Sequence, residues 1–178
     1  MVKYIAFLRA INVGGKNIIK MNELKKKFES IGFKDVSTYI QSGNVLFSSD
    51  ITDEKVLVKK IQNELHKTLS NDVIVFLKTQ THVRLILEDN PFKKVKSIEA
   101  KRYITFIRDE LKKKLNLPYF SSKKDVEIIS VDGYEICCLS HEIKGSYGFP
   151  NLFVENEFKI KATTRNWNTL EKIVSTIK

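Results

Sequence analysis

Hydrophobic and polar positions in the first half of the chain alternate with two different periods, which separates predicted strands from predicted helices. Four stretches have period two and are predicted strands, at residues 3–9, 36–39, 45–48 and 73–77. Residues 22–31 and 52–69 carry apolar side chains at helical spacing, with Gly32 placed to end the first helix and Thr52 to cap the second. The predicted order is βαββαβ, that of a ferredoxin-like unit.

The second half follows a short predicted helix at residues 81–87. The Asn90-Pro91 step and the lysine-rich run 93–96 indicate a boundary between one subdomain at residues 1–90 and another at residues 91–178. The later predicted elements are a strand at residues 102–107, a short helix at 109–115, a hairpin at 126–139 and a helix at 150–158. A last predicted helix begins between residues 164 and 168. Asp132-Gly133 is a strong signal for the hairpin turn. The predicted fold class is therefore α+β, a ferredoxin-like βαββαβ unit with a second, related βαββ-plus-helices half.

The first predicted strand is apolar on both faces. Tyr4, Ala6 and Leu8 lie on one face, and Ile5 and Phe7 on the other. We expect both faces of the sheet to be covered. An RNA-recognition sheet needs one open face with stacking aromatic side chains, so this kind of RNA-binding module is disfavoured.

The formal net charge of +10 favours an anionic partner. The lysine runs at residues 25–27, 59–60 and 112–114 lie in predicted helices, where such runs usually form a solvated face. We therefore expect no specific nucleic-acid recognition. Non-specific nucleic-acid binding through the basic surface is kept as an alternative.

The apolar runs are all shorter than the roughly 18 residues that a membrane-spanning helix requires. The N-terminus leads directly into the first predicted strand without the apolar core of a signal peptide. With 42% hydrophobic residues among 178, the chain has enough apolar side chains for an ordinary core. These features predict a cytoplasmic protein with no membrane segment.

Cysteine and histidine spacing indicates no metal site. Cys137 and Cys138 are neighbours on a predicted strand and point to opposite faces, which predicts reduced packing residues. His66, His82 and His141 have no second residue at metal-ligand spacing. The sequence identifies no cofactor and indicates no oligomeric state.

The least ordinary chemistry lies between the first strand and the first helix. Arg9 ends the strand and is followed by Asn12, the pair Gly14-Gly15 and Lys16. Adjacent glycines allow positive φ and close approach of a ligand to backbone N–H groups, which attract anions when they precede a helix. The segment lacks the spacing and the Ser/Thr of a P-loop, so a tight turn with nothing bound is the alternative.

Three motifs together resemble one family. They are RAINVGG at residues 9–15, TYIQSGNV at residues 38–45 and ATTRNWNT at residues 162–169. Their order and separation are similar to those of the bacterial DUF1697 family, from Met1 to about Ile177. The resemblance implies an α+β protein with ferredoxin-like topology in two related halves. It implies no activity, substrate, cofactor or catalytic residue.

Antiparallel pairing of the first and third strands predicts that the loop after Arg9 lies beside the turn from Gln41 to Asn44. If residues 163–166 cap the last helix over the same end of the sheet, one basic pocket forms, with Trp167 as a stacking wall. Alternatively, Thr164, Asn166 and Asn168 only cap a helix, with Asn168 and Glu171 at the spacing of a capping box, Trp167 is core and Arg165 pairs with a surface carboxylate. The candidate ligand-binding residues are Arg9, Asn12, Gly14, Gly15, Lys16, Gln41, Ser42, Asn44, Thr164, Arg165, Asn166 and Trp167.

The predicted function is binding of a small anionic or phosphate-containing ligand in this pocket. An enzyme that uses the same pocket for acyl or phosphoryl chemistry is an alternative, and a scaffold without a ligand is another. Ser42 precedes Gly43, as a nucleophile in a turn does, but it lacks the preceding glycine of a G-x-S-x-G elbow and an identifiable histidine base. We interpret it as a turn residue.

Overall fold

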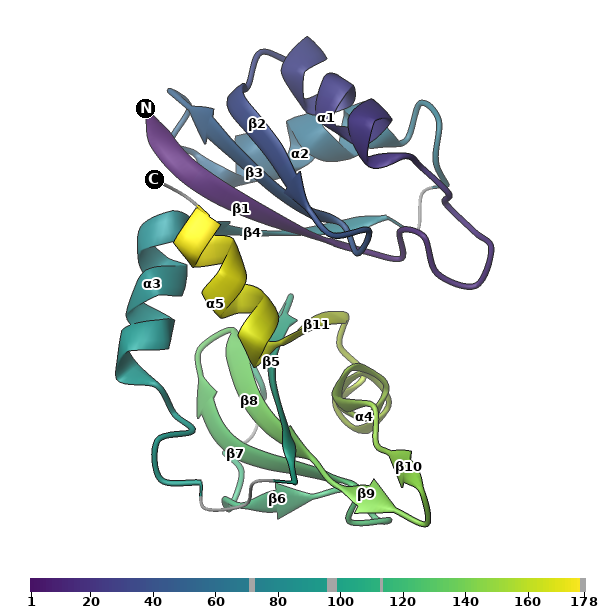
Figure 1. The fold of residues 1–178 in the computed structure, drawn as a ribbon, viewed down its shortest axis with the longest axis vertical. Coiled ribbons are helices and arrows are strands. Elements are labelled where there is room, and N and C mark those ends of the chain that lie inside the picture. Colours follow the sequence, from purple (N-terminus) through teal and green to yellow (C-terminus); the bar gives the residue numbers. More distant parts are fainter. Residues whose placement is uncertain (71–72, 96–98, 113, 177–178) are drawn as a thin grey trace. The chain divides into compact units, whose positions relative to one another are not determined.

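The computed structural model describes residues 1–70, 73–95, 99–112 and 114–176. These residues form a mixed α+β fold with antiparallel sheets and five helices (Figure 1). The chain divides into two compact units, Met1–Arg84 and Leu85–Lys178, which we call unit 1 and unit 2. Each unit is described by itself. Lys96, Lys113 and Ile177, which belong to predicted features, lie outside the described residues.

Unit 1 contains the six elements that the periodicity predicts. They are β1 (Val2–Arg9), α1 (Met21–Ser30), β2 (Lys34–Tyr39), β3 (Asn44–Ser49), α2 (Glu54–Leu65) and β4 (Ile74–Thr79). The strands form an antiparallel sheet in the order β2-β3-β1-β4. The helix that follows, α3 (Gln80–Asp89), crosses the division between the units.

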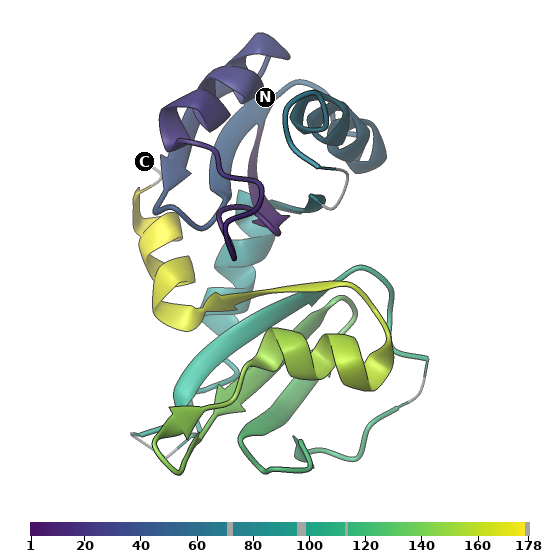
Figure 2. The same cartoon turned by 90° about the vertical axis from the view of Figure 1, so that its right-hand side faces the viewer.

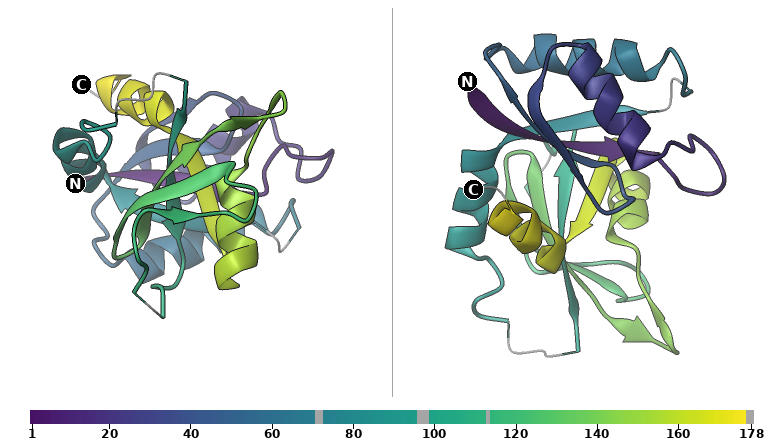
Figure 3. Two further views of the ribbon diagram at one scale, coloured as in Figure 1. Left: turned by 90° about the horizontal axis from the view of Figure 1, so that it is seen from below. Right: turned by 45° about the horizontal axis from the view of Figure 1, so that its top comes forward.

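The core of unit 1 lies between the sheet and the helices α1 and α2, which cover the same face of the sheet (Figure 3). Phe47 on β3 is at the centre of an aromatic cluster, with ring centroids 5.5 Å from Tyr4, 5.6 Å from Phe28 and 4.2 Å from Phe33. Such ring pairs add to the stabilisation that burial alone provides. β1 is buried along both of its faces, as its apolar pattern predicts.

The start of α2 differs by one residue from the prediction. The carboxylate of Asp53 accepts hydrogen bonds from the backbone N–H groups of Lys55 at 2.8 Å and Val56 at 3.3 Å. Asp53 is therefore the N-cap, and the prediction that Thr52 caps the helix is wrong. A carboxylate is favoured here because it also interacts with the positive end of the helix dipole.

A charged cluster joins the two helices of unit 1. The Glu64 carboxylate on α2 lies 3.4 Å from the ammonium of Lys27 on α1 and 2.5 Å from that of Lys67. The hydrogen bond from Lys67 is the main cause that lowers the pKa of Glu64 below its ordinary value, and Lys27 adds to it. Because the folded state lowers this pKa, the pair stabilises the fold above the ordinary glutamate pKa and less as the pH falls.

Glu64→Gln is expected to lower the free energy of unfolding by about 1 kcal/mol at neutral pH, because it removes the charge that two lysines share. The difference from the native protein should shrink at acidic pH, below the lowered pKa of Glu64 in the folded state, where this carboxylate is protonated in both states. Urea unfolding of both proteins at neutral and at acidic pH measures this difference. Glu29→Gln is the matched control, because Glu29 forms an ion pair with Lys25 in which both side chains are exposed. A loss that is equal at both pH values would contradict the ion-pair origin.

Unit 2 contains a five-stranded antiparallel sheet in the order β11-β5-β8-β7-β6 and a small two-stranded sheet, β10-β9. The strands are β5 (Lys101–Ile107), β6 (Tyr119–Phe120), β7 (Val126–Asp132), β8 (Glu135–Ser140), β9 (Glu142–Ile143), β10 (Ser146–Tyr147) and β11 (Ala162–Asn166). The helices are α4 (Pro150–Phe158) and α5 (Trp167–Thr176). Figure 2 shows α4 lying across the sheet, where Val154 joins a buried cluster with residues of β5, β7, β8 and β11.

Two predictions for unit 2 are confirmed. β7 and β8 form a hairpin around the Asp132-Gly133 step, with Gly133 at a φ of 51°. Pro150 is in the first turn of α4, where its missing N–H costs no hydrogen bond.

One other prediction for unit 2 is wrong, and another is correct only in part. The described residues between 109 and 115 form no helix, so the βαββ order is not repeated and lysines 112 and 114 are not on a helix face. Residues 163–166 belong to β11, which pairs with β5, and only the last of them caps the helix, since the Asn166 side chain accepts a hydrogen bond from the Asn168 N–H at the start of α5. The β-branched side chains of Thr163 and Thr164 suit a strand, and Thr164 shares a 2.7 Å hydrogen bond with Thr105 across the pair.

Candidate functional site

The loop between β1 and α1 contains a tight turn at its tip. Val13 and Lys16 form an isolated antiparallel bridge, and the Lys16 N–H donates to the Val13 carbonyl at 3.2 Å. The two residues between them, Gly14 and Gly15, have φ angles of 60° and 75°, as a type I′ turn requires. Figures 1 and 3 show this loop extending beyond the end of the sheet. The glycine pair therefore serves a turn, whatever the loop binds.

Two asparagines brace the base of the loop. The Asn12 side-chain amide donates to the Ile19 carbonyl at 3.1 Å, and its oxygen accepts from the Ile19 N–H at 2.9 Å. Asn17 donates to the Ala10 carbonyl at 2.9 Å and accepts from the Ser70 N–H at 2.8 Å. Both asparagines have positive φ, which asparagine tolerates better than most residues. These amides satisfy backbone groups that the irregular loop leaves without ladder partners.

The turn between β2 and β3 lies against this loop, as the strand pairing predicts. The Leu8 N–H donates to the Gly43 carbonyl at 2.8 Å, and the Asn12 amide donates to the Gln41 carbonyl at 3.3 Å. Asn44 is buried, and its amide donates to the Tyr39 carbonyl and to the Ser42 hydroxyl oxygen. Two of the three predicted segments therefore meet, and Ser42 and Asn44 hold the turn together.

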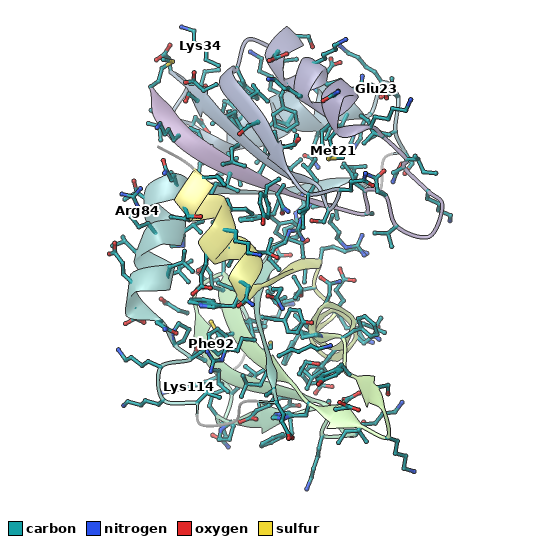
Figure 4. All side chains as sticks on the ribbon, in the orientation of Figure 1. Met21, Glu23, Lys34, Arg84, Phe92 and Lys114 are labelled. Atoms are coloured by element: carbon teal, nitrogen blue, oxygen red, sulfur yellow. The ribbon has the colours of Figure 1, made fainter. Side chains whose placement is uncertain are left out.

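A pocket of about 600 Å³ opens where this loop meets the start of α1. Its lining residues come from the loop, the first turn of α1 and the β2–β3 turn: Asn12, Gly15, Ile18, Ile19, Lys20, Met21, Asn22, Glu23 and Gln41. Lys20 is the N-cap of α1, and its side chain makes no capping hydrogen bond. Figure 4 shows Met21 and Glu23 at the start of the helix, next to the loop.

The pocket contains three predicted site residues, Asn12, Gly15 and Gln41. It also contains the start of α1, which the prediction left out. A sequence signal for it exists, since Lys20 stands where Ser, Thr, Asp or Asn would normally cap a helix. A helix start without a capping side chain leaves backbone N–H groups for water or a ligand.

Arg9 and Lys16 are not among the residues that line the pocket. Arg9 follows the alternation of β1, so it shares a face with Ile5 and Phe7, opposite the face that α1 and α2 cover. Lys16 is exposed in the turn at the loop tip. The predicted convergence of these two cations on the loop pocket is therefore wrong.

The third predicted segment belongs to unit 2, where Thr164, Arg165 and Asn166 are part of β11. Arg165 is a buried residue of β11, 8% exposed, and donates to the Thr163 hydroxyl at 2.8 Å and the Thr164 carbonyl at 2.9 Å. Burial lowers the pKa of its guanidinium to about 10. Arg165 is thus not the surface arginine that the sequence suggested.

Trp167 is a core residue of unit 2. Its ring is 3% exposed and meets the Phe92 ring edge-on, with centroids 4.9 Å apart. Its indole N–H donates to the Glu171 carboxylate at 3.1 Å. Glu171 therefore does not complete a capping box with Asn168, whose N–H donates instead to the Asn166 side chain. A ring this deeply buried has no open face for a ligand to stack on.

Unit 2 has a pocket of its own, of about 770 Å³, at the end of the sheet where β5 begins. The positive charges of one lysine and one arginine on β5 are balanced there by the negative charges of two glutamates. The lining residues are Glu99, Ala100, Lys101, Arg102, Glu142, Tyr147, Asn166 and Asn168. The Lys101 ammonium lies 3.5 Å from the centre of the Tyr147 ring, a cation–π contact. Asn166 is the one predicted site residue in this pocket.

The cysteines and the search for metal-binding clusters add no further candidate site within the described residues. Cys137 and Cys138 are buried and unpaired on β8, and burial raises the pKa of the Cys137 thiol to about 11. The described part of the chain contains no group of three or more His, Cys, Asp or Glu residues that could hold a metal ion. Among the described helices, none is long and apolar enough to cross a membrane.

Comparison with known proteins gives a family and a fold. The family model "Protein of unknown function (DUF1697)" matches residues 1–136, which include the first two motifs but not the third. The solved structure of the bacterial protein SP0830 from Streptococcus pneumoniae is similar over 99% of each chain, with 22% sequence identity and a TM-score of 0.70. At this identity the likeness shows a shared fold. No curated protein matches the chain.

Proposed function

The chain belongs to the DUF1697 family, whose description names no activity, and from the geometry of unit 1 we propose that it binds a small anionic or phosphate-containing ligand. The observation that carries this proposal is the pocket of about 600 Å³ at the uncapped start of α1. The first N–H groups of a helix and its dipole together favour an anion at that end. The braced loop and the Gln41 turn supply the opposite walls.

The lining side chains determine how strong this preference is. Lys20 adds a positive charge beside the helix start, and Gln41 adds a side-chain amide. Glu23, in the first turn of α1, adds a negative charge to the same pocket. Since the two formal charges cancel, backbone donors and the helix dipole provide the anion preference, and we expect a modest, salt-sensitive affinity.

Inorganic phosphate is the probe that tests this proposal, by calorimetric titration of the full chain at low salt. Lys20→Met is expected to weaken phosphate binding about two- to fivefold, as the loss of an exposed charge contact does. Glu23→Gln is expected to strengthen it by a similar factor, because it removes a repulsive charge. The two variants thus change the affinity in opposite directions.

Lys26→Met is the matched control, since Lys26 is an exposed lysine of α1 outside the pocket lining. It carries the same change of net charge as Lys20→Met and should leave the affinity almost unchanged. Equal effects of the two lysine variants would indicate only a general attraction to a basic protein. No measurable phosphate binding would overturn the proposal.

Acyl or phosphoryl chemistry in this pocket would need a nucleophile beside a general base. Ser42 directly follows the lining residue Gln41 and offers a hydroxyl. Its hydroxyl oxygen accepts a hydrogen bond from the Asn44 side-chain amide. This arrangement favours a turn role, so we propose binding without catalysis. Non-specific nucleic-acid binding and a cytoplasmic location stay predictions.

For the fold of unit 1 we propose the ferredoxin-like class. The order of its elements from β1 to β4 and the strand order β2-β3-β1-β4 support this class. In such a unit β1 and β3 are the central strands, so the loop after β1 and the turn before β3 lie at one end of the sheet.

A further inference from the structure

The pocket at the start of β5 in unit 2 has no part in the proposed function, and its charges are balanced. Two basic and two acidic side chains line it: Lys101, Arg102, Glu99 and Glu142. The whole chain, in contrast, carries a formal net charge of +10. A cavity with equal numbers of both charges gives little preference to a simple anion and favours a ligand that carries one charge of each sign.

Strand alternation separates the two basic side chains of this pocket. Lys101 and Arg102 are consecutive residues of β5, so their side chains leave opposite faces of the sheet. The Lys101 ammonium lies 3.5 Å from the centre of the Tyr147 ring. Arg102 is half-buried, and within the described part of the chain its guanidinium forms no ion pair and no hydrogen bond. A ligand carboxylate would satisfy this cation through charge-assisted hydrogen bonds.

The acidic side chains gather around the Tyr147 hydroxyl. Tyr147 pairs with Glu142 across β9 and β10, and its hydroxyl donates to the Glu99 carbonyl at 3.5 Å. Burial is the main cause that raises the pKa of this hydroxyl above its ordinary value, and the two carboxylates add to it. The Lys101 ammonium over the ring balances one of these carboxylates. One negative charge is therefore left on this side of the pocket, and Arg102 supplies one positive charge on the other.

We infer that this pocket binds a short peptide with both termini free. The peptide ammonium lies at Glu99 and Glu142, its carboxylate lies at Arg102, and the amides of Asn166 and Asn168 are available to its peptide bonds. In a single amino acid the two charged groups share one carbon, which is too short for partners on opposite faces of a strand. Each further residue separates them by up to roughly 3.5 Å.

The cavity of about 770 Å³ has the size of pockets that hold small molecules, which range from about 300 to 1,000 Å³. The inference does not rest on the proposed anion site, because that site belongs to unit 1. The outcome of the phosphate titrations therefore leaves it untouched.

Titration of the full chain with glycine, diglycine and triglycine tests the length of the ligand. These probes carry the same two charges and no side chain, so they differ only in the distance between the charges. We expect triglycine to bind about tenfold more tightly than glycine, followed through the backbone amide signals of Lys101 and Asn168. Triglycine with an acetylated N-terminus or an amidated C-terminus should bind about fivefold to tenfold more weakly than free triglycine, because one ion pair is lost.

Arg102→Met tests the partner of the carboxylate. It should weaken triglycine binding about tenfold and leave the binding of triglycine amide within about twofold, since the amide has already lost the charge that Arg102 recognises. Arg108→Met is the matched control, because Arg108 is exposed after β5 and lies outside the pocket lining. It carries the same change of net charge and should keep the native affinity for triglycine.

Glu142→Gln tests the partner of the ammonium in the same way. It should weaken triglycine binding about threefold to fivefold, because Glu99 stays in place, and leave the binding of acetylated triglycine almost unchanged. Glu110→Gln, an exposed glutamate outside the lining, is its control. Equal affinities for glycine and triglycine, equal affinities for free and blocked triglycine, or no binding of any of these probes would overturn the inference.

Discussion

Gly43→Ala is expected to lower the free energy of unfolding of unit 1 by about 2–4 kcal/mol. Gly43 has a φ of 71°, and a Cβ there would lie 3.0 Å from the Leu8 Cβ and 3.2 Å from the Leu8 carbonyl oxygen. Leu8 is buried in β1, and its N–H donates to the Gly43 carbonyl, so it cannot move away cheaply. Urea unfolding followed through the backbone amide signals of β1 measures the loss.

Gly14→Ala separates backbone strain from this contact. Gly14 has a φ of 60°, but a Cβ there would meet nothing within 4 Å. Its replacement should cost only the strain of a left-handed alanine, about 1 kcal/mol. Equal losses for the two variants would contradict the view that the β2–β3 turn is packed directly against β1.

Asn12→Ala is expected to lower the free energy of unfolding of unit 1 by about 2–3 kcal/mol, since it removes three hydrogen bonds and leaves an alanine at positive φ. It is also expected to weaken phosphate binding on the order of tenfold. The reason is geometric, because the Asn12 amide joins Ile19 to the Gln41 turn, and both contribute to the pocket. Urea unfolding and phosphate titration of the same variant measure the two effects.

Asn63→Ala is the matched control for Asn12→Ala, because Asn63 is exposed on α2 and does not line the pocket. It should change neither quantity beyond about 0.5 kcal/mol. If Asn12→Ala destabilised unit 1 but kept the native phosphate affinity, the pocket would not depend on the braced loop.

Much of unit 1 could be predicted from the sequence because each strand or helix is long enough to repeat its pattern of hydrophobic and polar residues more than once. The alternation in β1 and the helical spacing of α1 and α2 each determine one buried face, and the strand pairing then brings the loop after Arg9 beside Gln41. The partners of Asn12 could not be predicted in this way. Whether its amide faces a ligand or its own loop depends on where the chain returns at Ile19, which no local pattern encodes.

The errors in unit 2 have a similar cause. The polar run before Trp167 is typical of a helix start, but its β-branched threonines pair with β5 once that strand is in place. Burial of Arg165 and Trp167 follows from that pairing and from the contact with Phe92, which are tertiary features. The site in unit 1 was predicted in part because the order of the elements indicates that β1 pairs with β3, and the missed start of α1 shows that an absent cap is itself a signal.

Chemical-shift mapping of the full chain during titration with inorganic phosphate tests the central claim most directly. The claim is that an anion binds at the start of α1, in the pocket beside the braced loop. It predicts saturable shifts of the backbone amide signals of Gly15, Met21 and Asn22, with one common dissociation constant. Shifts that do not saturate, or that are confined to amides of unit 2 such as Asn168, would contradict it.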